Sequence, residues 1–528
     1  MRAYRILIPA FLLLTFFDPA TLLGQQSSVV CYFNRPVNTL IATGPQAGYL
    51  NGTFADTIAA YINRATLSID ICMYNYTATA GSYVARIATA VNAAVARGVQ
   101  VRWVHNSLAS TLNTGLSLVS SQVPRLSAPD QSGYIMHNKF MVIDVNAADS
   151  NQAVVMAGSC NWSDDQTISD YNNLIFIRSK QVALAFYREF NQMWGSTGMQ
   201  PETTLSRFGR NKQVSQQTRF LVNGMPVEVY FSPRDSLGVR LEDYISTANR
   251  NLFFGIFAFT DFSISDSILN KYNRGVSVRG VMDNWSNNTA AYNNLVPALG
   301  ENVKVVSGSS DFHTKALVVD ALNPASDPLV FTGSFNWTAA AQFSNDENAV
   351  VIHDAAIANQ YYQSFCNDFT ALGGPPCEAS PCPTGPISIT CNKRGTTYQW
   401  QADTGTGFVN LSNNSFYSGT ANMNLVLSNP PTSWYGFRYR CLVNDNQLSD
   451  TTTLTFTAYW NGSVNENWEN PANWNCGSLP DANTDVIINP GVRFFPQINT
   501  STTCRSLRLS KGAAARLLDG INLTLTGK

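Results

Sequence analysis

The chain has 528 residues, which is too long for a single hydrophobic core and indicates several domains. Its formal net charge is −1 and only 13% of its residues are charged, so no strong overall field attracts nucleic acid or an anionic membrane. A site for an anionic substrate must therefore be formed locally.

The N-terminus has the profile of an export signal. Positive charges precede the apolar run 6–17, and small and polar residues follow it. Asp18 and Pro19 interrupt the region before it reaches the ~20 residues that span a bilayer. We therefore expect residues 1–24 to be a signal peptide, no transmembrane segment elsewhere, and a secreted or cell-surface protein.

An internal repeat dominates the first two thirds of the chain. Each copy has a short apolar strand, an amphipathic helical stretch, a second strand, a further helix and a third strand. The copies lie about 175 residues apart, a period typical of a duplicated domain. Strands that alternate with helices imply an α/β sandwich with a partly parallel sheet in each half. The expected second and third strands are 68–74 and 99–104 in the first half, and 251–257 and 276–282 in the second.

Two copies of one motif carry the candidate chemistry. Segments 136–144 and 312–320 both contain His-x-Lys-x4-Asp, with histidine and lysine two residues apart on a strand-like run and therefore on one face. Each motif is followed at a matching distance by Gly-Ser-x-Asn-Trp. The motif residues are His137, Lys139, Asp144, Ser159 and Asn161 in the first half, and His313, Lys315, Asp320, Ser334 and Asn336 in the second.

These residue types suit cleavage of a phosphodiester. The reaction needs a nucleophile, a proton donor for the leaving oxygen, and charged or hydrogen-bonding groups for the other phosphate oxygens. Imidazoles titrate near neutral pH and can fill the first two roles, while the lysines and asparagines supply charge and amide donors. No metal is required.

The pattern resembles the phospholipase D superfamily, whose signature is a pair of His-x-Lys-x4-Asp motifs, each followed by Gly-Ser-x-Asn. The resemblance covers residues 28–372 and implies an α/β fold of two phospholipase D-like sandwich halves, 28–197 and 225–372, that share one active site. It implies that His137 attacks phosphorus to form a phosphohistidine, and that His313 protonates the leaving group and then activates water. No cofactor or metal is expected.

The other motif residues have supporting roles in this interpretation. Lys139 and Lys315 provide positive charge, whereas Asp144 and Asp320 orient loops or pair with basic neighbours. Four residues are expected to bind the substrate: Ser159, Asn161, Ser334 and Asn336.

One position distinguishes the two halves. The family places a carboxylate that orients a histidine where the second half has Glu347, but the matching residue of the first half is Asn172. An amide orients an imidazole yet stabilises imidazolium less, so the two histidines are predicted to differ in pKa. Asp170 is an alternative partner, and the sequence leaves open which histidine each group contacts.

Other noticeable residues are interpreted as structural. His105 ends a predicted strand and His353 lies in an apolar run. Four aromatic residues beside the motifs are expected in the core: Tyr74, Trp162, Phe257 and Trp337. A basic run between the halves is expected to be a solvated connector: Arg207, Arg210, Lys212 and Arg219.

Both motif asparagines also lie in glycosylation sequons, Asn161-Trp162-Ser163 and Asn336-Trp337-Thr338. Glycans there would block the predicted pocket. A bacterial exported protein, in which the sequons are silent, is therefore favoured.

Two β-rich units are expected after the halves. A shift toward Pro, Cys, Ser and Thr near 373–376 marks a linker. Segment 384–459 looks like an immunoglobulin-like sandwich because Cys391, Trp400 and Cys441 have the spacing of that fold. The all-β fold of this segment would be independent of the catalytic halves.

The last segment, 460–528, resembles the start of the β-solenoid modules of secreted multidomain bacterial proteins. Cysteines are concentrated in this last third, and without nearby histidines they favour disulfides over a zinc site. Cys476 and Cys504 form a plausible pair, whereas the pairing of three further cysteines stays open. These three are Cys366, Cys377 and Cys382.

The leading functional hypothesis is hydrolysis of a phospholipid head-group ester, because the chain has no extended basic track for a polyanion. Apolar residues between 108 and 123 are then expected to meet acyl chains. A metal-independent secreted nuclease of the same superfamily is the alternative, with nucleic acid as partner, and a non-catalytic adhesive protein is the third. The β-rich units are expected to contact cell surfaces or glycans. The catalytic unit is expected to be monomeric because one chain holds both halves.

Overall fold

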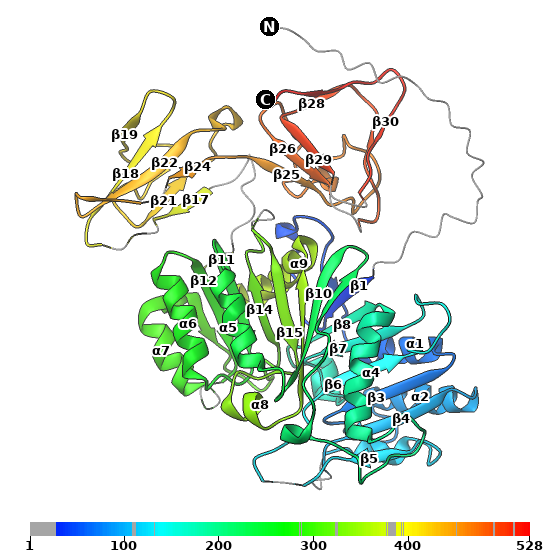
Figure 1. Cartoon of the computed structure of the whole chain (residues 1–528). Coiled ribbons are helices and arrows are strands. Elements are labelled where there is room, and N and C mark those ends of the chain that lie inside the picture. Colours follow the sequence, from blue (N-terminus) through cyan, green and yellow to red (C-terminus); the bar gives the residue numbers. More distant parts are fainter. Residues whose placement is uncertain are drawn as a thin grey trace.

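The computed structural model describes residues 28–527 apart from 108–111, 131, 285, 287, 323–325, 376, 378–386, 392, 394, 450, 489–491 and 510–512. The expected signal peptide lies outside these residues. Figure 1 shows two α/β halves side by side and two smaller β-rich units beyond them. In the described part of the chain, no helix is long and apolar enough to cross a membrane.

The first half is a mixed eight-stranded sheet with helices on both faces. Its strands are β1 (Val29–Phe33), β2 (Gly48–Tyr49), β3 (Ser68–Met73), β4 (Gln100–His105), β5 (Arg125–Ser127), β6 (Lys139–Ile143), β7 (Val154–Gly158) and β8 (Asn173–Arg178). Its helices are α1 (Phe54–Arg64), α2 (Arg86–Ala96), α3 (Asp164–Ile168) and α4 (Lys180–Trp194). The strand order is β2-β1-β8-β7-β6-β3-β4-β5, and α1 and α2 cover one face while α4 covers the other.

The second half repeats this arrangement. Its strands are β9 (Arg219–Val222), β10 (Met225–Ser232), β11 (Asn251–Ile256), β12 (Ser277–Met282), β13 (Val303–Val305), β14 (Lys315–Val319), β15 (Leu329–Gly333) and β16 (Glu347–His353). Its helices are α5 (Leu237–Thr247), α6 (Phe262–Asn273), α7 (Thr289–Leu299), α8 (Ala339–Phe343) and α9 (Ala355–Ala371). The order β13-β12-β11-β14-β15-β16-β10-β9 places β14 in the middle of the sheet, as β6 is in the first.

The duplicated, partly parallel architecture is confirmed. β3 pairs in parallel with β4 and antiparallel with β6, and β11 makes the same two pairings with β12 and β14. The helices before β4 and β12 are followed, one residue after their C-caps, by Gly98 and Gly275, whose φ angles of 88° and 92° lie in the left-handed region that glycine adopts without strain.

The two halves share a hydrophobic core in addition to a core of their own. Phe186 of α4 lies with its ring 5.1 Å from that of Phe231 of β10, and Phe33 of β1 lies 5.0 Å from Tyr361 of α9. These contacts join α4 to β10 and α9 to β1, so the helix on the inner face of each sheet packs against the other half. Burial of apolar surface therefore holds the halves together as one unit.

The segment after the halves forms two antiparallel sheets around buried Trp400 and Tyr439. Their strands are β17 (Ile387–Thr390), β18 (Tyr398–Asp403), β19 (Phe408–Asn410), β20 (Tyr417–Ser418), β21 (Asn424–Leu427), β22 (Arg438–Val443), β23 (Gln447–Leu448) and β24 (Thr452–Thr453). The sheet orders are β17-β21-β20 and β19-β18-β22-β23, with β24 beside β22.

The last unit consists of short parallel ladders. Its strands are β25 (Thr457–Trp460), β26 (Asp485–Ile488), β27 (Gln497–Ile498), β28 (Thr502–Cys504), β29 (Ser506–Leu509), β30 (Arg516–Leu517) and β31 (Leu523–Leu525). β25, β26 and β29 pair in parallel, as do β27 with β30 and β28 with β31. Trp460, Trp468 and Trp474 form the centre of its core.

The cysteine predictions meet a mixed outcome. Cys366 and Cys377 are joined by a disulfide between α9 and the following linker. The expected bond between Cys476 and Cys504 is wrong, because Cys504 is a buried free thiol. Cys391 and Cys441 are likewise free thiols packed in one core, and Cys382 lies outside the described residues.

Candidate active site

The two motif histidines lie just before β6 and β14, the central strands of the two sheets. Each histidine bonds to a residue from the other half. His137 Nδ1 lies 2.7 Å from Glu347 Oε2, and His313 Nδ1 lies 3.2 Å from Asn172 Oδ1. The two motifs therefore meet in one site at the boundary between the halves, as predicted, and the question of which group contacts which histidine is answered.

The carboxylate beside His137 is held in place by its own half. Ser334 donates its hydroxyl to Glu347 Oε2 at 2.7 Å, and the same hydroxyl oxygen accepts the Asn348 N–H at 3.0 Å. Glu347 and Ser334 are fully buried. Because the partner of Nδ1 is an acceptor, neutral His137 keeps its proton on Nδ1 and leaves a lone pair on Nε2.

The amide beside His313 is held in the same way. Ser159 donates to Asn172 Oδ1 at 2.8 Å, and Asn172 Nδ2 donates to the Gln166 carbonyl oxygen at 2.9 Å. Asp170 does not replace the missing carboxylate, since it accepts bonds from Gln166 Nε2 at 2.7 Å and from the Asp311 N–H at 2.9 Å. His313 thus has a neutral partner where His137 has a charged one.

The serines are a correction to the sequence interpretation. Ser159 and Ser334 were expected to bind substrate, but both are fully buried and donate to the residues that orient the histidines. The preceding glycines explain why these chains can approach so closely. A Cβ on Gly158 would lie 2.3 Å from the Asn173 carbonyl oxygen, and one on Gly333 would lie 2.2 Å from that of Asn348.

The two lysines lie beside the histidines, out of contact with bulk water. Lys139 Nζ donates to the His137 carbonyl oxygen at 3.1 Å, and Lys315 Nζ donates to that of His313 at 2.7 Å. Burial lowers the pKa of Lys139 to about 7. Burial, together with the charge of Lys139, lowers the pKa of Lys315 well below its usual value. An anion placed between the ammonium groups would reverse this effect.

The histidines also have low pKa values. Burial lowers the pKa of His137 to about 4, with Glu347 opposing this effect and Lys139 adding to it. Burial and the charges of Lys315 and Lys139 lower the pKa of His313 well below its usual range. Both imidazoles are therefore neutral at pH 7 in the empty site.

Two aromatic rings were wrongly expected to belong only to the core. The Tyr74 ring lies 4.8 Å from the His137 ring and 4.9 Å from Lys139 Nζ. The Phe257 ring lies 4.8 Å from the His313 ring, and Lys315 Nζ lies 4.7 Å from it. These half-buried rings form matching walls of the site. Trp162 and Trp337 are fully buried, as predicted.

The motif asparagines are suited to contact a substrate. The Oδ1 atoms of Asn161 and Asn336 are buried and have no hydrogen-bond partner in the described part of the protein. A buried polar atom without a partner is costly unless water or a ligand reaches it. Contact of these two side chains with the phosphodiester stays a prediction.

The motif aspartates hold the strand ends. Asp144 accepts the N–H groups of residues 66–68 and the Thr66 hydroxyl. Asp320 accepts the N–H groups of residues 249–251 and the Ser326 hydroxyl. Both have φ of 51°. Their structural role is therefore the loop-orienting one, not pairing with basic neighbours.

Two residues at the site were missed by sequence reasoning. Asn106 Oδ1 accepts the Met136 N–H at 3.0 Å, and Asp283 Oδ1 accepts the Phe312 N–H at 2.8 Å. Asn106 immediately follows β4 and Asp283 immediately follows β12, and each fixes the residue before a motif histidine. Their equivalent places after β4 and β12 were a signal that could have identified them.

The remaining histidines are structural, as predicted. His105 is buried and its Nδ1 lies 2.7 Å from the Asn106 carbonyl oxygen. His353 Nε2 lies 3.0 Å from Glu228, and its Nδ1 lies 3.1 Å from Asp327.

One expectation about connecting segments is wrong and another holds only in part. Leu116, Val119 and Val123 belong to the core of the first half, so this part of segment 108–123 is not free to meet acyl chains; residues 108–111 lie outside the described chain. The basic run was predicted to be solvated, and Arg207, Arg210 and Arg219 are exposed, but Lys212 is buried.

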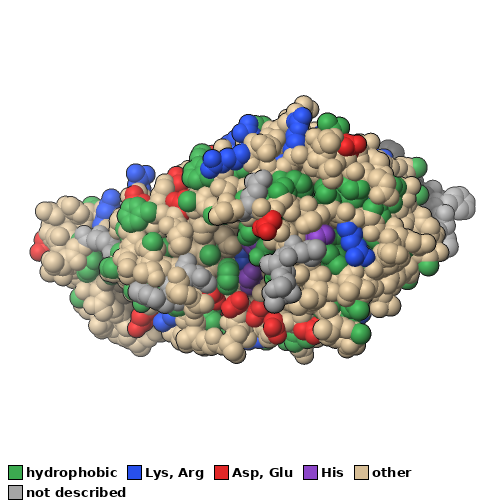
Figure 2. All heavy atoms as spheres, turned by 90° about the horizontal axis from the view of Figure 1, so that it is seen from below, with side chains coloured by type: hydrophobic (Ala, Val, Ile, Leu, Met, Phe, Trp, Pro, Cys, Tyr) green, Lys and Arg blue, Asp and Glu red, His purple; other side chains and the backbone are tan. Residues whose placement is uncertain are grey.

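The site opens onto the face shown in Figure 2, where histidine and basic side chains are visible at the bottom of a hollow with acidic side chains near it. Asp283 and Asp311 lie close enough to Lys315 to act on its pKa. Burial raises the pKa of Asp170 to about 6, with the Asp311 charge adding to this effect. Among the described residues, no group of three or more His, Cys, Asp or Glu side chains is placed to hold a metal ion.

Comparison with known proteins agrees with this geometry. The family described as "Cardiolipin synthase, PLD-like domain" matches residues 58–194 and 241–369, and a domain of unknown function matches 459–528. A mitochondrial cardiolipin hydrolase of Chlamydomonas reinhardtii is 32% identical over 127 residues, which are 24% of this chain and 54% of that protein. A phospholipase D of Rickettsia bellii is 30% identical over 143 residues, 26% of this chain and 67% of that protein.

Among solved structures, the phospholipase D family member Nuc from Salmonella typhimurium shares 28% identity over 28% of this chain and 94% of its own, with a TM-score of 0.25. The chain spans about half the length of the Chlamydomonas relative. The family match, in contrast, includes both motif-bearing halves and covers half of the present chain. The chain therefore belongs to the PLD-like family of phosphodiesterases in the phospholipase D superfamily.

Proposed function

We propose that the protein hydrolyses head-group esters of phospholipids through a phosphohistidine on His137. The observation that carries this proposal is the crossed pairing of the histidines, in which Nδ1 of His137 is bonded to Glu347 and Nδ1 of His313 to Asn172. Phosphorylation of Nε2 leaves the imidazole positively charged, and a carboxylate on Nδ1 stabilises that charge better than an amide does.

The reaction then has two steps. His137 Nε2 forms a bond to phosphorus while the bond from phosphorus to the head-group oxygen breaks, and His313 gives a proton to that oxygen. Water next attacks phosphorus, His313 takes its proton, and the bond to Nε2 breaks. The bound phosphate offsets the charges of Lys139 and Lys315, which otherwise lower the pKa of His313, so the substrate itself makes this histidine a better acid.

Electrostatics favour a lipid over a nucleic acid. Asp283 and Asp311 lie near Lys315, so negative charge adjoins the motif lysines. A nucleic acid would bring further phosphates toward these carboxylates, whereas a phospholipid presents one phosphodiester and often a cationic head group. A nuclease remains the second candidate, because the hollow in Figure 2 is open at the surface.

The substrate is tested by comparing two assays on the chain without residues 1–24. Release of choline or ethanolamine from mixed micelles should exceed cleavage of single-stranded DNA and RNA, at low and at physiological salt. Faster nucleic acid cleavage that falls steeply with salt would overturn the lipid assignment. No activity on any phosphodiester would favour the adhesive alternative.

The nucleophile is tested by trapping the intermediate. Quenching a His313→Asn variant during turnover with alkaline denaturant, followed by mass spectrometry without an acidic step, should place the phosphoryl adduct on His137. An adduct on His313 in the His137→Asn variant, together with no adduct on His137 in the His313→Asn variant, would reverse the roles.

The proposal extends to the other parts of the chain. Export by residues 1–24 places the enzyme outside the cell or on its surface, consistent with the sequence profile. The two-sheet unit around Trp400 is proposed to be an immunoglobulin-like sandwich and the parallel ladders of 459–528 a partial β-solenoid. Both are proposed to contact cell surfaces or glycans, and the catalytic unit is proposed to be a monomer.

A further inference from the structure

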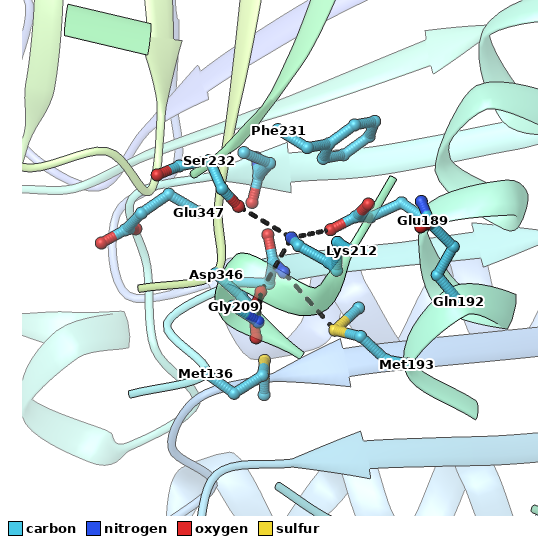
Figure 3. Close-up of polar contacts among 12 residues, drawn as sticks. Met136, Glu189, Gln192, Met193, Gly209, Lys212, Phe231, Ser232, Asp346 and Glu347 are labelled. Atoms are coloured by element: carbon cyan, nitrogen blue, oxygen red, sulfur yellow. Dashed lines mark hydrogen bonds and ion pairs between the residues drawn. The ribbon is translucent and has the colours of Figure 1, made fainter. Parts of the chain in front are cut away.

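A lysine from the connection between the halves is buried beneath the His137 side of the site. Lys212 lies between α4 and β9, and its side chain is 1% exposed. Its Nζ donates to Asp346 Oδ1 at 2.8 Å, to the Ser232 carbonyl oxygen at 2.7 Å and to Glu189 of α4. Figure 3 shows the ammonium group between these acceptors. We call Glu189, Lys212 and Asp346 the buried ion cluster.

Asp346 connects this cluster to the catalytic motif. Its carboxylate also accepts the Gly209 N–H at 2.9 Å and the Tyr134 hydroxyl. Its backbone oxygen accepts the His137 N–H at 2.9 Å, and its own N–H donates to the Ile135 carbonyl oxygen at 3.1 Å. The next residue is Glu347, the first residue of β16, whose carboxylate bonds to the His137 imidazole.

The cluster is charged in spite of its burial. Burial alone would lower the pKa of Lys212, but Asp346 and Glu189 outweigh it and hold this pKa above its usual value. Burial raises the pKa of Glu189 to about 7, although Lys212 opposes this effect. A buried ion pair adds little net stability compared with apolar side chains of similar size, but it fixes the positions of its members.

Among the described residues, the other side of the site has no such ion cluster. Tyr171 stands there in the place of Asp346, since its N–H donates to the Asp311 carbonyl oxygen at 2.9 Å. Ser364 stands in the place of Glu189, ten residues after the N-cap of α9 as Glu189 is after that of α4. Ser364 lines a cavity together with several phenylalanines and Asp368. Arg35 stacks on Tyr171, with its Cζ 4.5 Å from the ring centroid, and its side chain is partly exposed.

We infer that Lys212 is a positioning residue for the reaction: through Asp346 it sets the place of Glu347 relative to His137. This inference rests on the proposed function of the His137–Glu347 pair. Without the ammonium group, the pKa of Glu189 rises further and this residue takes up a proton, while Asp346 loses its bond to Lys212 Nζ, so the segment that contains Asp346 shifts. The hydrogen bond between Glu347 and the imidazole then loosens, although neither residue has been changed.

The kinetic test compares Lys212→Met with Lys212→Arg, and uses Arg35→Met as the matched control on the other side. The substrate is bis(4-nitrophenyl) phosphate, which makes the result independent of lipid preference. We expect Lys212→Met to lower kcat about tenfold or more with KM nearly unchanged, since small misplacements of catalytic groups have effects of this size. Lys212→Arg should recover most of the loss, and Arg35→Met should have almost wild-type kcat.

The pH profile separates positioning from simple loss of folded protein. Glu347 raises the pKa of His137, so a loosened contact should move the acidic limb of kcat/KM to lower pH. Unfolding of a fraction of the molecules would lower the rate at every pH and leave this limb in place. If Lys212→Met does not fold, Glu189→Leu/Lys212→Met removes one of the two carboxylates with the cation and serves in its place.

A second readout does not depend on turnover. The chain has only 4 histidines, so 15N-histidine labelling gives few signals, and His137→Asn identifies the Nδ1–H resonance of this residue. That resonance should shift in the Lys212 variant and stay in Arg35→Met. Folded Lys212 variants that keep the resonance, kcat and the acidic limb would overturn the inference. Absence of wild-type hydrolysis, in contrast, would overturn the proposed function while this measurement still decides the role of Lys212.

Discussion

The two sides of the active site have the same framework but different charges. On each side a histidine before a central strand bonds to a residue of the other half, a serine holds that residue, and a lysine lies beside an aromatic ring. The orienting residue is Glu347 on one side and Asn172 on the other. A duplicated scaffold can therefore give its two histidines different chemistry by changing one side chain, with no change in backbone pairing.

The difference extends below the site. The His137 side continues through Asp346 to a buried ammonium group, whereas the His313 side continues through Tyr171 to an aromatic and partly exposed region. A phosphohistidine carries a positive charge on its ring, and a negative group in a fixed position stabilises it. A histidine that donates a proton and then accepts one must instead have protonated and neutral forms of similar free energy. The more constrained side therefore suits the nucleophile.

Removal of either imidazole should reduce turnover to the same extent. His137→Asn and His313→Asn are each expected to lower turnover by about three orders of magnitude or more, because a two-step displacement needs both groups. Steady-state assays with bis(4-nitrophenyl) phosphate measure this. Chelation with EDTA should leave the wild-type rate unchanged; a loss that a divalent ion restores would disprove a metal-free mechanism.

Substitutions of the two orienting residues should lower kcat by different amounts on the two sides. Glu347→Gln keeps the shape but removes the charge, so we expect kcat to fall about 100-fold through loss of phosphohistidine stabilisation. Asn172→Ala removes a neutral orienting bond and should cost about tenfold. Single-turnover assays that follow formation and decay of the adduct give both values. Equal losses in the two variants would mean that the charge of Glu347 has no special role.

The duplicated scaffold and the residues of the candidate site could be predicted from the sequence because they recur. Two copies of the motif, at equal places in two strand and helix patterns, identify the sheets, both histidines and the unequal pair Glu347 and Asn172. Asp144 and Asp320 were expected to orient loops or to pair with basic neighbours, and their contacts to the backbone of residues 66–68 and 249–251 support the first role.

Features that depend on contacts between distant segments could not be predicted. Lys212 lies in a run of basic residues, and only the packing of the two halves encloses it between Glu189 and Asp346. Ser159 and Ser334 occupy motif positions that suggest substrate contact, but the close approach of neighbouring strands at the preceding glycines turns them inward. Periodicity and motifs contain no information on these long-range contacts.

The lysines should make phosphate binding depend on pH. The pKa of Lys139 is about 7 in the empty site, below its usual value, so the amine is largely neutral above pH 7 and must take up a proton to bind an anion. We expect the affinity for inorganic phosphate to fall about fivefold from pH 7 to pH 8 as this amine loses its proton. Calorimetry in buffers of different ionisation enthalpy should detect proton uptake at pH 8. Affinity that stays constant over this range would show that Lys139 is charged without a ligand.

The smallest effect on activity is expected at the motif aspartates, where the two sides are alike. Asp144→Asn should lower the free energy of unfolding by about 2–4 kcal/mol, because a carboxylate that accepts several backbone N–H groups is replaced by an amide with one acceptor oxygen. Asp320→Asn should have the same effect through residues 249–251. Asparagine tolerates the φ of 51° found at both positions, so Asp144→Ala and Asp320→Ala should each lose about 1 kcal/mol more. Urea unfolding measures these values, and kcat of the folded variants should remain within about threefold of the wild type, since neither carboxylate contacts a histidine in the described structure. A much larger fall in kcat at one aspartate alone would show that the two sides differ in their support as well as in their charge.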